Sequence, residues 1–138
     1  MYAKLLKEYA KNIEFSKLKP AATEDEIQEA EKKLDIMFPK ELRVFLEETN
    51  GDDYLCLPVS RIVEDNLQLR RGLDPEFFNA NEYLFIAENG CGDYYGYKIE
   101  DGEIRSNSIY IWEHEEFEVR MVAVGIAELI KLYYQDQI

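Results

Sequence analysis

The chain has 138 residues, of which 46% are hydrophobic and 33% are charged. This length is enough for one domain with a single buried core, and the apolar content excludes a disordered or fibrous chain. The formal net charge at pH 7 is −13. A surface this acidic repels nucleic acid and anionic membranes and attracts basic partners. We therefore expect one domain, residues 1–138, that binds neither nucleic acid nor a membrane.

The start of the chain and its cysteines indicate the compartment. The N-terminus is a charged amphipathic stretch and not an apolar signal core, and the longest apolar run, residues 121–127, is too short to span a bilayer. Two cysteines are too few for a disulfide scaffold and lack the spacing of a zinc site. We expect a cytoplasmic protein in which Cys56 is a buried thiol and Cys91 a partly exposed one, with a bridge between them as the minor alternative.

The negative charge is unevenly distributed along the chain. Residues 1–43 contain nine basic and nine acidic residues, whereas residues 44–138 contain seven basic and twenty acidic ones. Such an acidic surface can serve only solubility, or it can also raise the rate of encounter with a basic partner. The charge pattern leaves both interpretations open.

The first third of the chain is predicted to be helical. Apolar residues at helical spacing predict an amphipathic helix over residues 1–13, followed by a linker. Thr23 and Glu26 form a capping box at the start of a second helix, because each side chain can satisfy a free backbone N–H group there. Pro39 fits the first turn of a third helix, which Asn50-Gly51 ends.

Later in the chain the pattern changes to short extended runs separated by turn residues. Asn89-Gly90 and Asp101-Gly102 are typical hairpin turns. The runs predict strands at residues 54–57, 83–87, 93–99 and 108–112, with a last short strand at residues 121–124.

Helical segments interrupt and follow these strands. We expect a short helix capped by Ser60, a turn at residues 74–76, and a terminal helix over residues 126–133. The predicted fold is therefore α+β, with N-terminal helices packed on a mainly antiparallel curved sheet and a C-terminal helix. Residues 83–87 should pair with residues 93–99, because the turn between them is short.

Three motifs follow one another in a distinctive order. They are the capped helix and the proline-started helix within residues 23–51, the turn Gly92-Asp93-Tyr94-Tyr95, and the segment Trp112-Glu113-His114-Glu115. This order resembles the SUKH superfamily, specifically its Smi/Knr branch, over residues 23–133. The resemblance implies an α+β domain that acts by binding. In bacteria such domains commonly serve as immunity proteins against polymorphic toxins, and in fungi they include regulators of cell-wall synthesis.

The sequence favours neither a catalytic site nor a metal site. Cys91 could act as a nucleophile, with His114 as its base and Asp93 as the group that orients the base. However, His114 is the only histidine, and the acidic residues that flank it favour the protonated imidazolium, which cannot accept a proton. Asp52-Asp53 and the acids around His114 lack the spacing of an EF-hand. Gly90-Cys91-Gly92 lacks the lysine and the helix of a phosphate loop. We expect no catalytic residue, no metal and no cofactor.

The candidate binding residues lie in two short segments. Tyr110 and Trp112 share one face of a strand, opposite Ile109 and Ile111, and the aliphatic pair is the better core candidate. Exposed rings beside acids would suit a partner that brings arginine or lysine, with ordinary core packing as the alternative. Asp93 is expected to accept hydrogen bonds from backbone donors in its own turn, with partner contact as its less favoured role. The predicted partner-binding residues are Asp93, Tyr94, Tyr110, Trp112, Glu113, His114, Glu115, Glu116 and Glu118.

These observations favour a binding protein over an enzyme. We expect an immunity protein that neutralises a cognate toxin with a basic surface, such as a nuclease. The alternative is an intracellular regulatory or scaffold domain of the same fold that binds an endogenous protein. A third possibility, of a different class, is a small hydrolase that uses Cys91.

Overall fold

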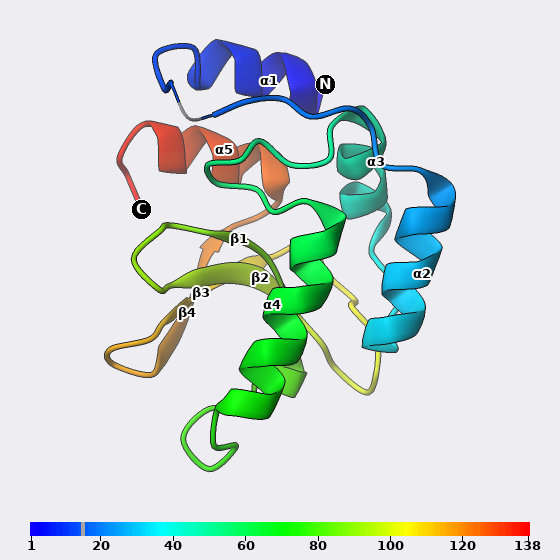
Figure 1. Cartoon of the computed structure of the whole chain (residues 1–138). Helices are drawn as coiled ribbons and strands as arrows, with labels where there is room; N and C mark the ends of the chain where they lie inside the picture. The colour runs from blue at the N-terminus through cyan, green and yellow to red at the C-terminus, as the bar shows by residue number, and fades with distance from the viewer. Residues whose placement is uncertain (15) are drawn as a thin grey trace.

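Helices form the first half of the chain and strands most of the second half in the computed structural model (Figure 1). The structure describes residues 1–14 and 16–138; Phe15, in the predicted linker, lies outside the described residues. The helices are α1 (Tyr2–Tyr9), α2 (Glu24–Leu34), α3 (Lys40–Glu48), α4 (Val59–Gly72), the 3₁₀ helix η1 (Ala80–Glu82) and α5 (Ile126–Tyr134). The strands are β1 (Tyr83–Glu88), β2 (Tyr94–Lys98), β3 (Ile109–Glu113) and β4 (Glu118–Ala123). The fold is therefore α+β with a C-terminal helix, as predicted.

The starts of α2 and α3 follow from local sequence. The backbone N–H of Glu26 donates to Thr23 Oγ1 at 3.1 Å, and the backbone N–H of Thr23 donates to Glu26 Oε1 at 3.0 Å, so the predicted capping box is confirmed. Pro39 does not lie in the first turn of α3 as predicted, because it is the residue that precedes the first helical residue. The first helix is also shorter than predicted and ends at Tyr9.

The helix predicted to be capped by Ser60 is longer and begins earlier. It starts at Val59 and spans 14 residues, so Ser60 lies inside it. Pro58 at the N-cap position has no side-chain donor or acceptor. Instead, Asn50 Oδ1 accepts a hydrogen bond from the backbone N–H of Val59 at 2.8 Å. The side chain of Asn50, nine residues earlier, therefore caps this helix. Cap motifs that are read from adjacent residues do not predict this contact.

The four strands form one antiparallel sheet in the order β1-β2-β3-β4. Ala87 pairs with Tyr95 in β2, so the predicted pairing of residues 83–87 with residues 93–99 is confirmed. A Cβ atom at Gly96 would lie 2.2 Å from the backbone oxygen of Leu84, so this position in β2 accepts only glycine. The last strand begins at Glu118 and is longer than predicted.

Residues 54–57 do not form the predicted strand. Cys56 makes only an isolated bridge with Ala87. The reason is the fully buried carboxylate of Asp52, whose Oδ1 accepts hydrogen bonds from the backbone N–H groups of Leu55 at 2.9 Å and Cys56 at 2.7 Å. Because those two N–H groups donate to the carboxylate, they are not available for the hydrogen bonds of a regular strand pair.

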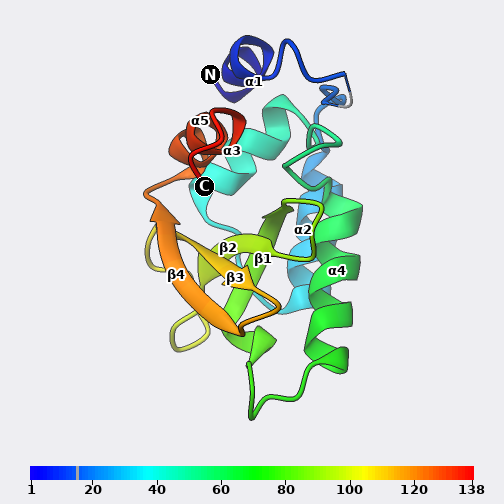
Figure 2. The same cartoon turned by 90° about the vertical axis from the view of Figure 1, so that its left-hand side faces the viewer.

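The helices and the sheet enclose two apolar clusters. α1 packs against α5 and α3 at one end of the molecule, while α2 and α4 lie side by side along its flank (Figures 1 and 2). Strand alternation directs Leu84 and Ile86 of β1 into the main cluster that these helices cover. The other face of β1 carries Tyr83 and Phe85, which join a smaller aromatic cluster with Trp112.

The two cysteines and the lengths of the helices can also be compared with the sequence. Both thiols are free, with Cys56 buried and Cys91 exposed, as the sequence predicts. In residues 1–14 and 16–138, every helix is too short or too polar to cross a membrane.

Candidate functional site

The turn after β1 and the end of β3 are joined by one carboxylate. Asp93 Oδ1 accepts from the backbone N–H of His114 at 3.0 Å and lies 2.6 Å from its ring atom Nδ1. Asp93 Oδ2 accepts from the side-chain amide of Asn89 at 3.0 Å. Burial alone raises the pKa of the Asp93 carboxyl, but the hydrogen bonds from His114 and Asn89 outweigh burial and hold that pKa below its usual value.

This arrangement corrects the expected role of Asp93. The backbone donors of this turn do not go to the Asp93 side chain as predicted, because Asn89 Oδ1 accepts from the backbone N–H groups of Cys91 at 2.9 Å and Asp93 at 3.3 Å. Gly92 completes the turn with a φ of 99°. A Cβ atom there would lie 2.8 Å from the ring of His114, so the glycine lets the imidazole pack directly on the backbone.

The tip of the β3–β4 hairpin brings most of the predicted acidic residues together. Asp93, Glu113, His114, Glu115 and Glu116 line a shallow pocket of about 150 Å³, and Cys91 lines it too. The three residues considered for nucleophilic catalysis therefore meet at this pocket. The other side chains that line it are carboxylates, so its chemistry favours a cationic group from outside.

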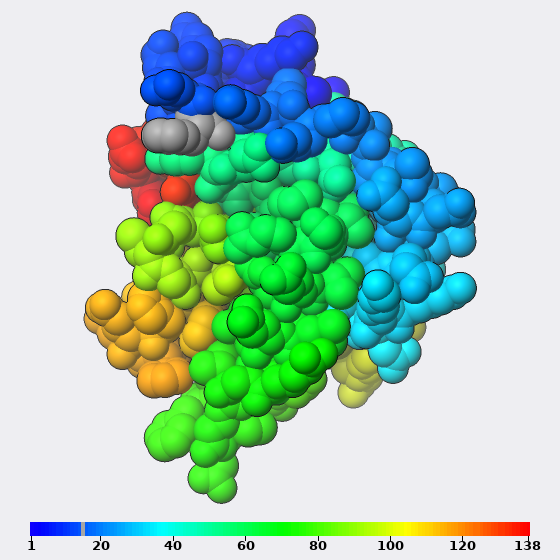
Figure 3. All heavy atoms as spheres, in the orientation of Figure 1, coloured from blue at the N-terminus to red at the C-terminus, as the bar shows by residue number. Residues whose placement is uncertain are grey.

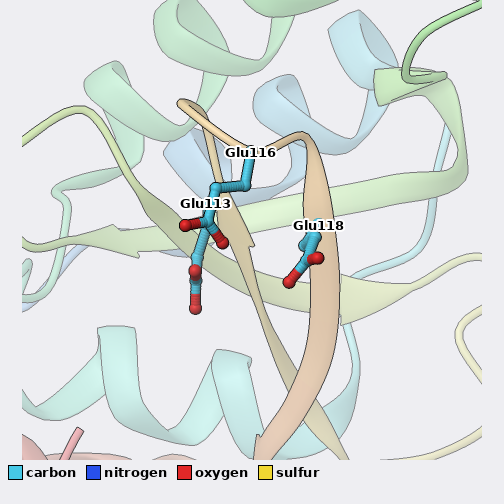
Figure 4. A group of neighbouring side chains, drawn as sticks. All are labelled: Glu113, Glu116 and Glu118. Atoms are coloured by element: carbon cyan, nitrogen blue, oxygen red, sulfur yellow. The ribbon is translucent and has the colours of Figure 1, made fainter.

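Three carboxylates form a cluster beside this pocket. Glu113, Glu116 and Glu118 each place an oxygen within 4.8 Å of the others, and Figure 4 shows that they come from β3, the turn and β4. Arg120 donates to Glu113 Oε1 from Nε at 3.0 Å and from Nη2 at 2.9 Å. Glu113 is therefore paired within the chain, whereas Glu116 and Glu118 are exposed and contribute uncompensated charge to the surface.

Trp112 is not available to a partner, contrary to prediction. Its side chain is only 3% exposed. The ring of Phe78, from the loop that follows α4, stacks on it with centroids 4.9 Å apart and an interplanar angle of 11°. Alternation correctly placed Trp112 opposite Ile111, but it gave no sign that a distant loop covers the aromatic face.

The other two predicted aromatic residues are half-buried. The Tyr94 hydroxyl donates to Asp65 Oδ2 at 2.9 Å, and burial together with this carboxylate raises the pKa of Tyr94. Tyr110 packs against Tyr83 with centroids 6.2 Å apart. Tyr94 therefore connects β2 to α4, and Tyr110 packs from β3 against the smaller aromatic cluster.

Sequence reasoning missed two exposed aromatic residues at the same end. Phe77 is 70% exposed and Phe117 is 47% exposed, and their ring centroids lie 6.1 Å apart. The available signal was the position of Phe117 between Glu116 and Glu118, since a large apolar residue inside a charged turn has no core to enter.

A larger cavity lies away from these residues. It has a volume of about 700 Å³, and none of the predicted site residues lines it. Arg70 lies in its wall and donates from Nη2 to the backbone oxygen of Tyr83 at 3.0 Å. The cavity wall carries more acidic than basic side chains, with Arg70 and Lys98 against Asp35, Glu82, Glu100 and Asp101.

Comparison with known proteins assigns the chain to a family. No match was found among curated proteins. The sequence model of the SMI1 / KNR4 family (SUKH-1) matches residues 21–131, which is most of the chain. The match begins near the capping box and continues into α5, so it includes the whole sheet. It also includes the β1–β2 and β3–β4 turns, which the contact between Asp93 and His114 connects. The chain belongs to the SMI1 / KNR4 family (SUKH-1).

Proposed function

We propose that this protein acts by stoichiometric binding, as an immunity protein that neutralises a cognate toxin with a basic surface. Membership of the SUKH-1 family is consistent with a binding domain of the immunity type. The proposal extends this to a basic partner because the exposed carboxylates of the β3–β4 hairpin converge on one surface.

The observation that carries the proposal is the charge of this hairpin tip. Residues 113–118 contain four glutamates and neither lysine nor arginine. Glu115, Glu116 and Glu118 are exposed. A nuclease binds phosphates through a basic surface, and an acidic protrusion that covers this surface excludes its substrate.

The experiment is a protection assay with the toxin encoded beside this gene. Co-expression of this protein should restore growth of cells that produce the toxin, and purified toxin and protein should form a complex of fixed stoichiometry. The absence of a toxin gene in the neighbourhood, together with an endogenous protein partner, would instead favour a regulatory or scaffold domain.

The role of charge is tested with matched variants. The triple variant Glu115→Gln, Glu116→Gln and Glu118→Gln should associate with the toxin more slowly and with a weaker salt dependence, because salt screens exposed charges over about 8 Å. Glu113 is left unchanged because it pairs with Arg120. The control removes the same charge elsewhere, at the exposed residues Glu29, Glu47 and Glu64. Equal association rates for the two triple variants at low salt would contradict a steering role for the tip.

The hydrolase alternative has one supporting observation, which is that Cys91, Asp93 and His114 share a pocket. A Cys91→Ala variant separates it from binding. Under the proposal, this variant protects cells as well as the unchanged protein does. Loss of protection by a folded Cys91→Ala protein that still binds the toxin would favour catalysis.

A further inference from the structure

Two exposed phenylalanine rings meet at the acidic end of the molecule. Phe77 belongs to the loop between α4 and η1, and Phe117 to the turn between β3 and β4, so they are distant in sequence and in contact in space. Both loops project at the same end, where the space-filling view shows the orange hairpin tip beside the green loop (Figure 3). The rings form a small apolar surface outside the aromatic cluster, which Phe117 contacts through Trp112 at 6.5 Å.

The backbone holds Phe117 in an unfavourable conformation. Its φ is 53°, in the left-handed region that glycine and asparagine adopt readily and that a bulky aromatic residue rarely does. Its ring is half-exposed, so core packing accounts for only part of this arrangement. Residues held in such sparsely populated backbone conformations cluster at active sites, ligand clamps and switch regions.

The two loops that carry the ring pair are rich in acidic residues. The two loops, residues 73–79 and 113–118, contain six carboxylates and no lysine or arginine. An apolar surface rimmed by charge of one sign selects partners by that charge. A second copy of this chain is disfavoured as the occupant, because a two-fold contact would bring the same acidic loops face to face.

We propose that the Phe77–Phe117 pair is the anchor of the partner interface and receives an arginine-bearing segment of a basic protein. A planar guanidinium can stack on the face of either ring while its N–H groups reach the surrounding carboxylates. Phe117 lies directly between Glu116 and Glu118 in the sequence, so the ring and the carboxylates belong to the same short turn and strand start. The inference takes the class of partner from the proposed function and adds the residues that anchor it.

A peptide titration tests the anchor without the toxin. The probe is a synthetic peptide of alternating arginine and leucine. Its binding is monitored by nuclear magnetic resonance of the aromatic side chains of the protein. Binding should shift the ring signals of Phe77 and Phe117 most. Phe77→Ala and Phe117→Asn should each weaken peptide affinity roughly tenfold, since desolvated cation–π and apolar contacts are of that size. A peptide with lysine in place of arginine should bind several-fold more weakly.

The controls separate the rings from the charge and from folding. Asn tolerates the left-handed backbone at residue 117, so the Phe117→Asn variant should keep the thermal stability of the unchanged protein. Met37, which is 70% exposed on the connection between α2 and α3, supplies the matched apolar control, and Met37→Ala should leave peptide affinity unchanged.

The possible outcomes separate this inference from the proposed function. Unchanged peptide affinity in both phenylalanine variants overturns the anchor, and if the triple glutamine variant then loses affinity, charge alone binds the peptide. A dimer in sedimentation equilibrium that Phe117→Asn dissociates also overturns the anchor, because the occupant is then a second copy. Peptide binding as expected, without protection against a toxin, supports the anchor and contradicts the immunity role.

Discussion

Asp93 accepts two hydrogen bonds from one residue, from the backbone N–H of His114 at 3.0 Å and from its ring, where Nδ1 lies 2.6 Å from Oδ1. Because a carboxylate only accepts, Nδ1 carries a proton and the ring is held in one orientation. This contact joins the β1–β2 turn to the start of the β3–β4 turn. It therefore links the two loops that line the candidate pocket.

Replacement of Asp93 should weaken the fold in a pH-dependent way. Asp93→Asn should lower the free energy of unfolding at pH 7 by about 1–3 kcal/mol, because a charge-assisted hydrogen bond is lost. The pKa of Asp93 is lower in the folded protein than in the unfolded one. Its contribution is therefore fully present above about pH 4 and is lost as the pH falls through the folded pKa.

Urea unfolding between pH 3 and pH 7 checks this prediction. The difference between the two proteins should shrink on acidification. A difference that stays constant over this range would show that the Asp93 carboxylate is not the source of the effect.

The contribution of Glu41 to the free energy of unfolding should change with pH in the direction opposite to that of Asp93. Burial raises the pKa of its carboxyl, although hydrogen bonds from the Tyr97 hydroxyl, at 2.7 Å, and from the backbone of Ile126 oppose the rise. A raised folded pKa contributes stability below the unfolded value of about 4.3, and this contribution is lost as the pH rises through the folded pKa. Glu41→Gln keeps an acceptor for Tyr97, so its stability relative to the unchanged protein should increase from pH 4 to pH 7.

Chemical denaturation over this pH range measures the effect. Glu47→Gln supplies the control, because Glu47 is exposed on the same helix, α3. If the unfolding free energies of the Glu41→Gln variant and the unchanged protein differ by the same amount at every pH, the pKa of Glu41 is not raised by burial.

Trp112 should behave as a core residue and not as a binding residue. Trp112→Ala should cost about 3–5 kcal/mol of unfolding free energy, since it removes a buried indole that stacks on Phe78. Trp112→Phe should cost much less, because the buried indole N–H has no acceptor among the residues that the structure describes. Thermal melting of both variants distinguishes these effects, and a loss below about 1 kcal/mol for Trp112→Ala would indicate an exposed ring.

Asn66 should be essential for the contact between α4 and β1. Its side-chain amide donates to the backbone oxygen of Phe85 at 2.7 Å, and its oxygen accepts from the backbone N–H of Phe85 at 2.8 Å. Asn66→Leu leaves both buried groups without partners and should lower the unfolding free energy by about 2–4 kcal/mol. Gln68→Ala, at an exposed position of α4, should change it by less than about 0.5 kcal/mol in the same denaturation assay.

The sequence by itself determined the features that depend on near neighbours. Thr23 and Glu26 lie three residues apart, and the turn at residues 89–92 directly joins the two strands that it pairs, so the capping box and this hairpin were predictable. Local geometry settles such features, because the interacting groups cannot move far apart along a short segment. The acidic character of the β3–β4 turn follows from composition in the same way.

Only the tertiary structure decided which predicted residues face outward and which meet. Phe78 covers Trp112, Asp52 draws the N–H of Cys56 out of a regular ladder, and Asp93 holds His114. Alternation along a strand states which side chains share a face, but what covers that face comes from a segment elsewhere in the chain. The Phe77–Phe117 pair arose in the same way, because contacts between distant segments depend on how the whole chain packs.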